Sequence, residues 1–177
     1  MTKPSVESVP AVYHRYIERV AANSLTEALT EDFEALKSIF KKLNANQLNF
    51  AYDEDKWTLK QVLLHLIDTE RILSYRALRF GRGDRLEING FDQDLYAQSP
   101  GLKARSKKSL LDEFDLIRRS TRILFAGMNA DELRREGIAN GYMMSAENIG
   151  FVIAGHALHH LEVIHSHYLN SVKYPQS

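Results

Sequence analysis

The chain has 177 residues, of which 44% are hydrophobic and 26% charged, and its 23 basic residues balance 23 acidic ones. A chain of this length buries roughly two thirds of the surface that it exposes when unfolded, so it can form one globular domain. The neutral balance argues against a nucleic-acid-binding protein, which would carry a strongly basic patch. Cysteine is absent, which excludes disulfides, thiolate metal ligands and a cysteine nucleophile.

The N-terminal sequence and the hydropathy of the chain predict its cellular location. The first residues lack the apolar region of a signal peptide, and no run reaches the roughly 18 apolar residues of a membrane span. We therefore expect a cytoplasmic protein that binds neither membranes nor nucleic acids and acts on a small molecule. Residues 1–10, which include Pro4 and Pro10, are expected to form a flexible tail, and residues 11–177 a single domain.

Hydrophobic residues recur with a helical period along nearly the whole chain. Two capping boxes, Ser24 to Glu27 and Thr58 to Gln61, mark helix starts. The predicted helices in chain order are Val12 to Val20, Leu25 to Leu43, Leu59 to Ala77, Ser106 to Met128, a short turn after Asn129, and about Ser145 to about Asn170. No alternating pattern of strand residues competes with them.

Four long amphipathic segments and almost no strand signal predict an all-α fold, a four-helix bundle with a short N-terminal accessory helix. The connection between residues 82 and 105 has no helical period. A connection of this length is typically a binding loop, a lid or a crossover, and we expect it to lie over an end of the bundle.

The histidines give the clearest functional signal, because five of the seven lie between positions 156 and 167. His156 and His160 are four residues apart in a predicted helix, which places two imidazoles on one face, one turn apart. His65 stands among apolar residues of another predicted helix. Although a lone histidine on an apolar face is usually a core residue, the three together predict a metal site with coordination positions left open.

The other histidines are less suited to be ligands. His159 lies beside the face of His160 and is a better supporting or pocket group than a third ligand. His167 shares the inward stripe but lies about 10 Å farther along the helix axis, too far to reach the same ion. His165 and His14 have the pattern of surface residues.

Two acidic residues are candidates for supporting roles. Glu70 interrupts an apolar stripe, so it either orients a ligating imidazole or forms an internal ion pair with an arginine such as Arg118 or Arg122. Asp68 lies one turn from His65 and can be a hydrogen-bond acceptor for the site, a weak fourth ligand or a solvated residue. A series of arginines on the same helix and beyond it is either an anion-binding edge or a solvated face, and its members are Arg71, Arg76, Arg79, Arg82 and Arg85.

Three segments together resemble the DinB-like superfamily, over a likeness that runs loosely from about Tyr13 to Tyr168. The run from Trp57 to Asp84 resembles that family's second helix, Gly155 to His160 its last-helix motif, and Gly90 to Asp92 its middle loop. The resemblance implies an up-down-down-up bundle with a long crossover, often dimeric, and a divalent metal, commonly nickel or zinc, held by a histidine triad. Carried over residue by residue, the triad is His65, His156 and His160.

The resemblance also implies classes of reaction, since relatives with known activity transfer low-molecular-weight thiols or isomerise maleylpyruvate with a thiol. We expect a metal-dependent enzyme that activates a small thiol or water towards a small electrophilic substrate, with the thiol as a possible co-substrate. The alternatives are a non-catalytic, stress-associated metal-binding or dimerisation module, and a small-molecule binding protein without turnover. No catalytic residue beyond the triad is assigned, and a homodimer is expected.

Overall fold

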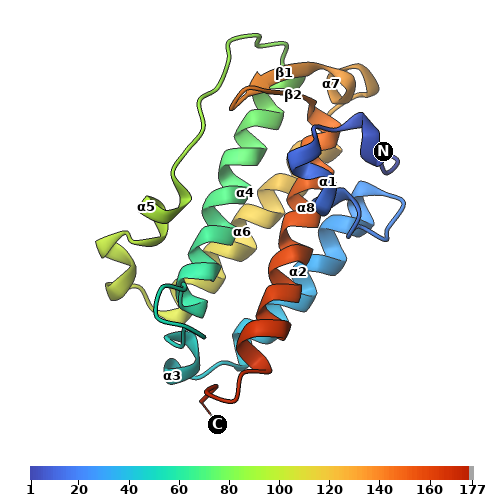
Figure 1. Ribbon diagram of the computed structural model, residues 1–177. Helices are drawn as coiled ribbons and strands as arrows, with labels where there is room; N and C mark the ends of the chain where they lie inside the picture. The colour runs from blue at the N-terminus through green and yellow to red at the C-terminus, as the bar shows by residue number, and fades with distance from the viewer. Residues whose placement is uncertain (176–177) are drawn as a thin grey trace.

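The computed structural model describes residues 1–175 and has four long helices, α2 (Leu25–Lys42), α4 (Leu59–Gly81), α6 (Lys107–Ala126) and α8 (Ala146–Val163). Figure 1 shows α4 and α6 running in one direction and α2 and α8 in the other. The predicted four-helix bundle of up-down-down-up topology is therefore confirmed. Within residues 1–175, no helix combines the length and apolar character needed to cross a membrane.

The helices begin where the capping residues predict. Thr58 and Gln61 form a reciprocal capping box at the start of α4, in which each side chain bonds the other residue's backbone N–H. Ser24 Oγ accepts a hydrogen bond from the backbone N–H of Glu27 at 3.3 Å at the start of α2. Three short helices precede α2, namely η1 (Val6–Ser8), η2 (Ala11–Tyr13) and α1 (His14–Ile17). Others lie between the long helices, namely α3 (Ala45–Leu48), α5 (Gln93–Ala97), η3 (Pro100–Ala104) and α7 (Ala130–Arg134).

The expectation of no strands is wrong at one end of the bundle. Strands β1 (Glu136–Ala139) and β2 (Tyr142–Ser145) pair as an antiparallel hairpin. Asn140 and Gly141 join them with φ values of 52° and 77°, the left-handed conformations of a two-residue hairpin turn. Ile88 of the crossover pairs with this hairpin, because its N–H donates to the Ile138 carbonyl at 3.0 Å.

The connection between α4 and α6 is a crossover that runs along the side of the bundle, as Figure 1 shows, so the expectation that it lies over an end was wrong. It has to return the chain to the starting end of α4, because α6 runs parallel to α4. Two short helices, α5 and η3, divide it, and Gln61 of α4 holds it in place by donating to the Ala97 carbonyl at 3.1 Å.

The N-terminal segment packs on α8. Val9, in the segment expected to be a flexible tail, is 4% exposed and belongs to the hydrophobic core. Thr2 forms an isolated bridge with Ser24. The backbone of α1 approaches α8 closely at Gly155, where an added Cβ would overlap the carbonyl group of Tyr16.

We expect Gly155→Ala to destabilise the protein by about 1–3 kcal/mol, because the methyl group has no space and α1 must move away. The displacement should also disturb the ring of Tyr16, which lies against His156. Thermal unfolding of Gly155→Ala beside Gly101→Ala measures this effect, since a Cβ at Gly101 meets no atom closer than 3.9 Å. Equal melting temperatures for the two variants would contradict the close approach.

Candidate metal site

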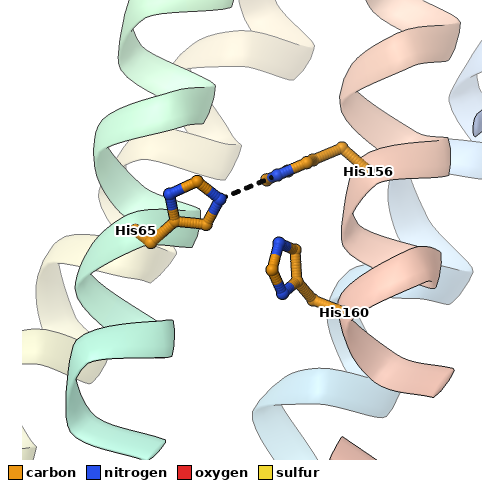
Figure 2. Close-up of side chains that lie close together, drawn as sticks. All are labelled: His65, His156 and His160. Atoms are coloured by element: carbon orange, nitrogen blue, oxygen red, sulfur yellow. Dashed lines mark hydrogen bonds between the residues drawn. The ribbon is translucent and has the colours of Figure 1, made fainter. Parts of the chain in front are cut away.

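Three imidazoles from α4 and α8 converge in the space between these helices, as Figure 2 shows. His65 Nε2 lies 3.0 Å from His156 Nε2. The ring of His160 lies 4.9 Å from that of His65 and 4.6 Å from that of His156, measured between centroids. One ligand atom from each of the three residues lies within 4.8 Å of the others. The structure thus brings together the triad that the sequence predicts.

The surroundings of the triad fix the rings and exclude most of the solvent. His65 and His156 are 5% and 7% exposed. Trp57 and Tyr16 lie against His65 and His156, with ring centroids 4.8 Å and 5.5 Å away. Thr69 Oγ1 lies 3.4 Å from His65 Nδ1, so the threonine hydroxyl can hydrogen-bond the ring nitrogen that faces away from His156. The sequence analysis missed Thr69, although it lies one turn from His65.

The arrangement fits a divalent ion. Two nitrogen ligands at about 2.0 to 2.1 Å from a tetrahedral zinc ion lie roughly 3.3 to 3.4 Å apart, and the Nε2 atoms of His65 and His156 are 3.0 Å apart, so a small outward movement of the rings would admit the ion. In the chain from 1 to 175, the buried Nδ1 of His160 has no hydrogen-bond partner. Each neutral imidazole has one N–H donor and one nitrogen lone pair, and three neighbouring rings with little solvent cannot satisfy all of these groups by hydrogen bonds to one another. A shared metal ion would accept one lone pair from each ring. Imidazole ligands suit zinc, nickel, copper and iron.

Burial keeps these imidazoles neutral. It lowers the pKa of His65 to about 4, with the neighbouring His159 acting in the same direction. Burial, and then the other histidines, lowers the pKa of His156 and His160 well below the ordinary value of 6.5. Because a metal ion binds the neutral form, protons compete weakly for this site near neutral pH.

We expect the metal-free protein to lose stability as the pH falls from about 6.5 to about 4. The unfolded histidines take up protons near pH 6.5 and the folded ones resist, so acid favours the unfolded state. For His65 alone the difference from 6.5 to about 4 corresponds to about 3 kcal/mol at the acid end. Burial raises the pKa of Asp32 to about 6, which acts in the opposite direction, but one carboxyl group is outweighed by three imidazoles.

Urea unfolding of the metal-free protein at several pH values checks this prediction. His65→Phe should show a smaller pH dependence than the wild type, because one of the three resisting imidazoles is gone. A free energy of unfolding that stays constant between pH 6.5 and pH 4 would contradict the buried, neutral state of the triad.

The remaining histidines take different places. His159 is half-buried, and its ring lies 5.2 Å from that of His160 and 5.8 Å from that of Tyr16. His165 is exposed, as expected. His14 is half-buried, and its Nε2 lies 3.0 Å from the Val9 carbonyl oxygen, so the surface assignment was wrong.

His167 also departs from its expected position on the inward stripe. It is exposed and stacks on Tyr52, with ring centroids 5.2 Å apart. The reason is that the helix changes to a π-helical segment, η4 (Ile164–Leu169), whose wider turn shifts the angular phase of the residues after Val163.

Glu70 forms the internal ion pair and not a contact with an imidazole. Arg118 donates to both carboxylate oxygens of Glu70, from Nε at 2.8 Å and from Nη2 at 2.9 Å. Nη1 of Arg118 donates to the carboxylate of Asp32 at 2.7 Å and to the Leu29 carbonyl at 2.8 Å. The three charged side chains are at most 4% exposed and join α2, α4 and α6. Asp32 is a member that the sequence analysis missed.

Asp68 points to charged neighbours. Its carboxylate lies 3.4 Å from the guanidinium of Arg71, which in turn pairs with Glu113 at 2.6 Å. The pKa of Asp68 is raised above its ordinary value, because the effect of burial outweighs the opposing effect of Arg71. These contacts make Asp68 part of a charged network between α4 and α6. The partners of its carboxylate are therefore found in this network and not in the triad.

A pocket of about 170 Å³ opens onto the triad, and His65 and His156 form part of its wall. The wall is completed by the N-terminal segment through Tyr13 and Tyr16, by the crossover through Gly90 and Phe91, and by the hairpin through Asn140. A group that enters this pocket therefore approaches two of the three candidate ligands.

Comparison with known proteins agrees with this arrangement. The model of the DinB superfamily matches residues 28–164, a range that contains all three triad histidines. Among solved structures, the fold is similar to that of YfiT from Bacillus subtilis, described as a probable metal-dependent hydrolase with an unusual four-helix bundle topology. That similarity has a TM-score of 0.72 at 18% identity and covers 80% of this chain and 82% of the other. A search of curated proteins found no match. The chain belongs to the DinB superfamily.

Proposed function

We propose that this protein is a metal-dependent enzyme that activates a small thiol or water towards a small electrophilic substrate. The observation that carries the proposal is the convergence of His65, His156 and His160, with ligand atoms within 4.8 Å of one another, where two of the three, His65 and His156, line a pocket. The description of YfiT as a probable metal-dependent hydrolase supports the same class of activity. Zinc or nickel is the ion that we propose.

The residues of this chain would hold the ion and shape its approach. His65, His156 and His160 would be the ligands, since the lowered pKa values leave their lone pairs free at neutral pH. A divalent ion held by three imidazoles supplies Lewis-acid chemistry, which lowers the pKa of a thiol or water at its open positions. Trp57 and Tyr16 would keep the rings in place and exclude water from their outer faces.

The side chains of the pocket add to the proposal. The chain has no cysteine, and the wall of the pocket contains no serine or lysine; its hydroxyl groups are those of Thr69, Tyr13 and Tyr16. An external thiol or water is therefore the nucleophile best suited to the site. A low-molecular-weight thiol is the co-substrate that we test first.

A non-catalytic metal-binding module is the competing proposal, in which the triad only stabilises the bundle. It requires a closed site whose ligands all come from the protein. The pocket wall includes His65 and His156, an arrangement that favours an open site and hence the enzyme. We keep a homodimer as a proposal that sedimentation would test.

The experiment measures the rate at which glutathione, bacillithiol, coenzyme A or water reacts with chlorodinitrobenzene and other small electrophiles in the presence of the protein. The rate should rise with zinc or nickel occupancy and vanish in His160→Ala. It should also persist at a pH where the uncatalysed thiol reaction fades, because free thiols ionise only near about 8.5 to 9. No acceleration over the metal-free protein with any nucleophile would favour the structural module.

A further inference from the structure

The arginine series on α4 and just beyond its end contains four residues in contact with acids or solvent, and Arg76, whose surroundings differ. Arg71 pairs with Glu113, Arg79 with Asp84 and Arg82 with Glu132, and Arg85 is exposed. Arg76 is 4% exposed, and the ion pairs found among residues 1–175 give it no carboxylate. A buried cation without a counterion is costly, so its presence needs a reason.

Arg118 provides a comparison within the same molecule. Both arginines are almost completely buried, at 2% exposure for Arg118 and 4% for Arg76. Arg118 donates to two carboxylates and a carbonyl, as a structural arginine does. Arg76 donates from Nη2 to the Asn89 carbonyl at 3.2 Å and forms a side-chain hydrogen bond with Tyr13, which supplies no carboxylate. Its buried Nε has no acceptor in the part of the chain that the structure describes.

The position of Arg76 relates it to the triad. Arg76 follows His65 by eleven residues, which is three helical turns plus roughly 20°, so both side chains leave the same face of α4. Long side chains on a helix lean towards its N-terminus, and this tilt directs the guanidinium of Arg76 towards His65. Both residues line the pocket of about 170 Å³. None of the described residues that line it is an aspartate or a glutamate.

We propose that Arg76 binds a carboxylate group of the substrate in this pocket, while the reactive part of the same molecule reaches the triad. The inference rests on the proposed function and names its substrate class as small carboxylic acids. A carboxylate matches the two parallel N–H groups that a guanidinium offers, and Nε has its N–H free. The pocket is smaller than the roughly 300 Å³ of typical ligand sites, so it accommodates a short acid and not a large anion.

Calorimetric titration of the zinc-loaded protein tests the proposal with mercaptoacetate, mercaptopropionate and mercaptobutyrate, each beside the mercapto-alcohol of equal length. In the wild type, at least one acid should bind roughly 10- to 100-fold more tightly than its alcohol. Arg76→Met should remove that preference, and Arg79→Met, a matched control paired with Asp84, should keep it. An acid preference that survives in Arg76→Met, or that is missing in the wild type, would overturn the proposal.

A second arm uses metal-free protein and no thiol, so it separates this inference from the proposed function. Acetate, propionate, butyrate and inorganic phosphate are added to the wild type, and the Nε–H resonance of Arg76 is followed by NMR. A shift of this resonance on addition of one of the carboxylates supports the proposal even if zinc fails to bind. Failure of zinc to bind would contradict only the metal-dependent function. Tighter binding of phosphate than of every carboxylate would overturn the assignment of a carboxylate.

Stability provides a readout that distinguishes ligand binding from a structural role. Arg76→Met should melt at or above the wild-type temperature, because it removes a buried cation that lacks a counterion. If the melting temperature of Arg76→Met fell by several degrees and the variant still bound the acid more tightly than the alcohol, the role of Arg76 would be structural. If Arg76→Met does not fold, Arg76→Lys serves, since it keeps the charge and loses the planar fork. An acid preference equal to the wild type in Arg76→Lys would contradict the role of the guanidinium.

Discussion

Replacing His156 with alanine is expected to abolish stoichiometric binding of zinc or nickel. His156 is the centre of the triad, because its Nε2 lies 3.0 Å from that of His65 and its ring 4.6 Å from that of His160. Two imidazoles on separate helices leave the ion with more solvent ligands than protein ligands, so the affinity falls by orders of magnitude. Metal analysis after dialysis measures the loss, and His65→Ala and His160→Ala should behave in the same way.

The control variants replace two histidines of η4, the segment that follows α8. His165→Ala and His167→Ala remove exposed imidazoles and should keep one metal ion per chain. Full metal occupancy in His156→Ala would show that the triad is wrong. His159 would then be the natural replacement, because its ring lies only 5.2 Å from that of His160 and its buried Nδ1 has no hydrogen-bond partner within residues 1–175.

Arg118→Met is expected to destabilise the protein by about 3 to 5 kcal/mol, because it leaves two buried carboxylates without their cation. For a chain of this size the loss corresponds to a fall in melting temperature of roughly 6 to 20 °C. Burial already raises the pKa of Asp32 to about 6 in the presence of Arg118, so removal of Arg118 should raise it further and favour the protonated form of Asp32. Thermal and urea unfolding at pH 7 measure the effect.

Three further variants define the cause of that loss. Lys108→Met removes an exposed ion pair from the same helix and should change the melting temperature little. Asp32→Leu and Glu70→Met combined with Arg118→Met should recover much of the stability, because an apolar core replaces the whole charged cluster. Glu70→Gln should lower stability and leave zinc affinity unchanged. A weakened zinc affinity in Glu70→Gln would instead connect the cluster to the triad.

The local signals of the sequence predicted the bundle because they act over three or four residues. Of the two predicted capping boxes, the one at Thr58 is complete, and at Ser24 the bond from the Glu27 N–H to the Ser24 side chain is the half that the structure shows. The spacing of His156 and His160 places their imidazoles together whatever the rest of the chain does. The hairpin had an equally local signal in Asn140-Gly141, which is a preferred two-residue hairpin turn. It was missed because its strands are only four residues long and lie between two helices.

Features that depend on tertiary packing were beyond the sequence. Asp32 lies beside the apolar stripe of α2, and only the approach of Arg118 from α6 explains its burial. Arg76 could not be separated from the four other arginines, because its burial depends on the N-terminal segment and on the crossover that close over α4. The exposure of His167 follows from the change to a π-helix at Ile164, which no pattern in the sequence predicted.

X-ray absorption spectroscopy of the zinc-loaded protein, before and after addition of a small thiol, tests the central claim most directly. We predict three imidazole nitrogens at about 2.0 to 2.1 Å before addition, and a new sulfur ligand at about 2.3 Å afterwards. The sulfur must come from the added thiol, since the chain has no cysteine. A zinc environment without three imidazoles, or one that excludes the added sulfur because four protein ligands already fill it, would contradict the account.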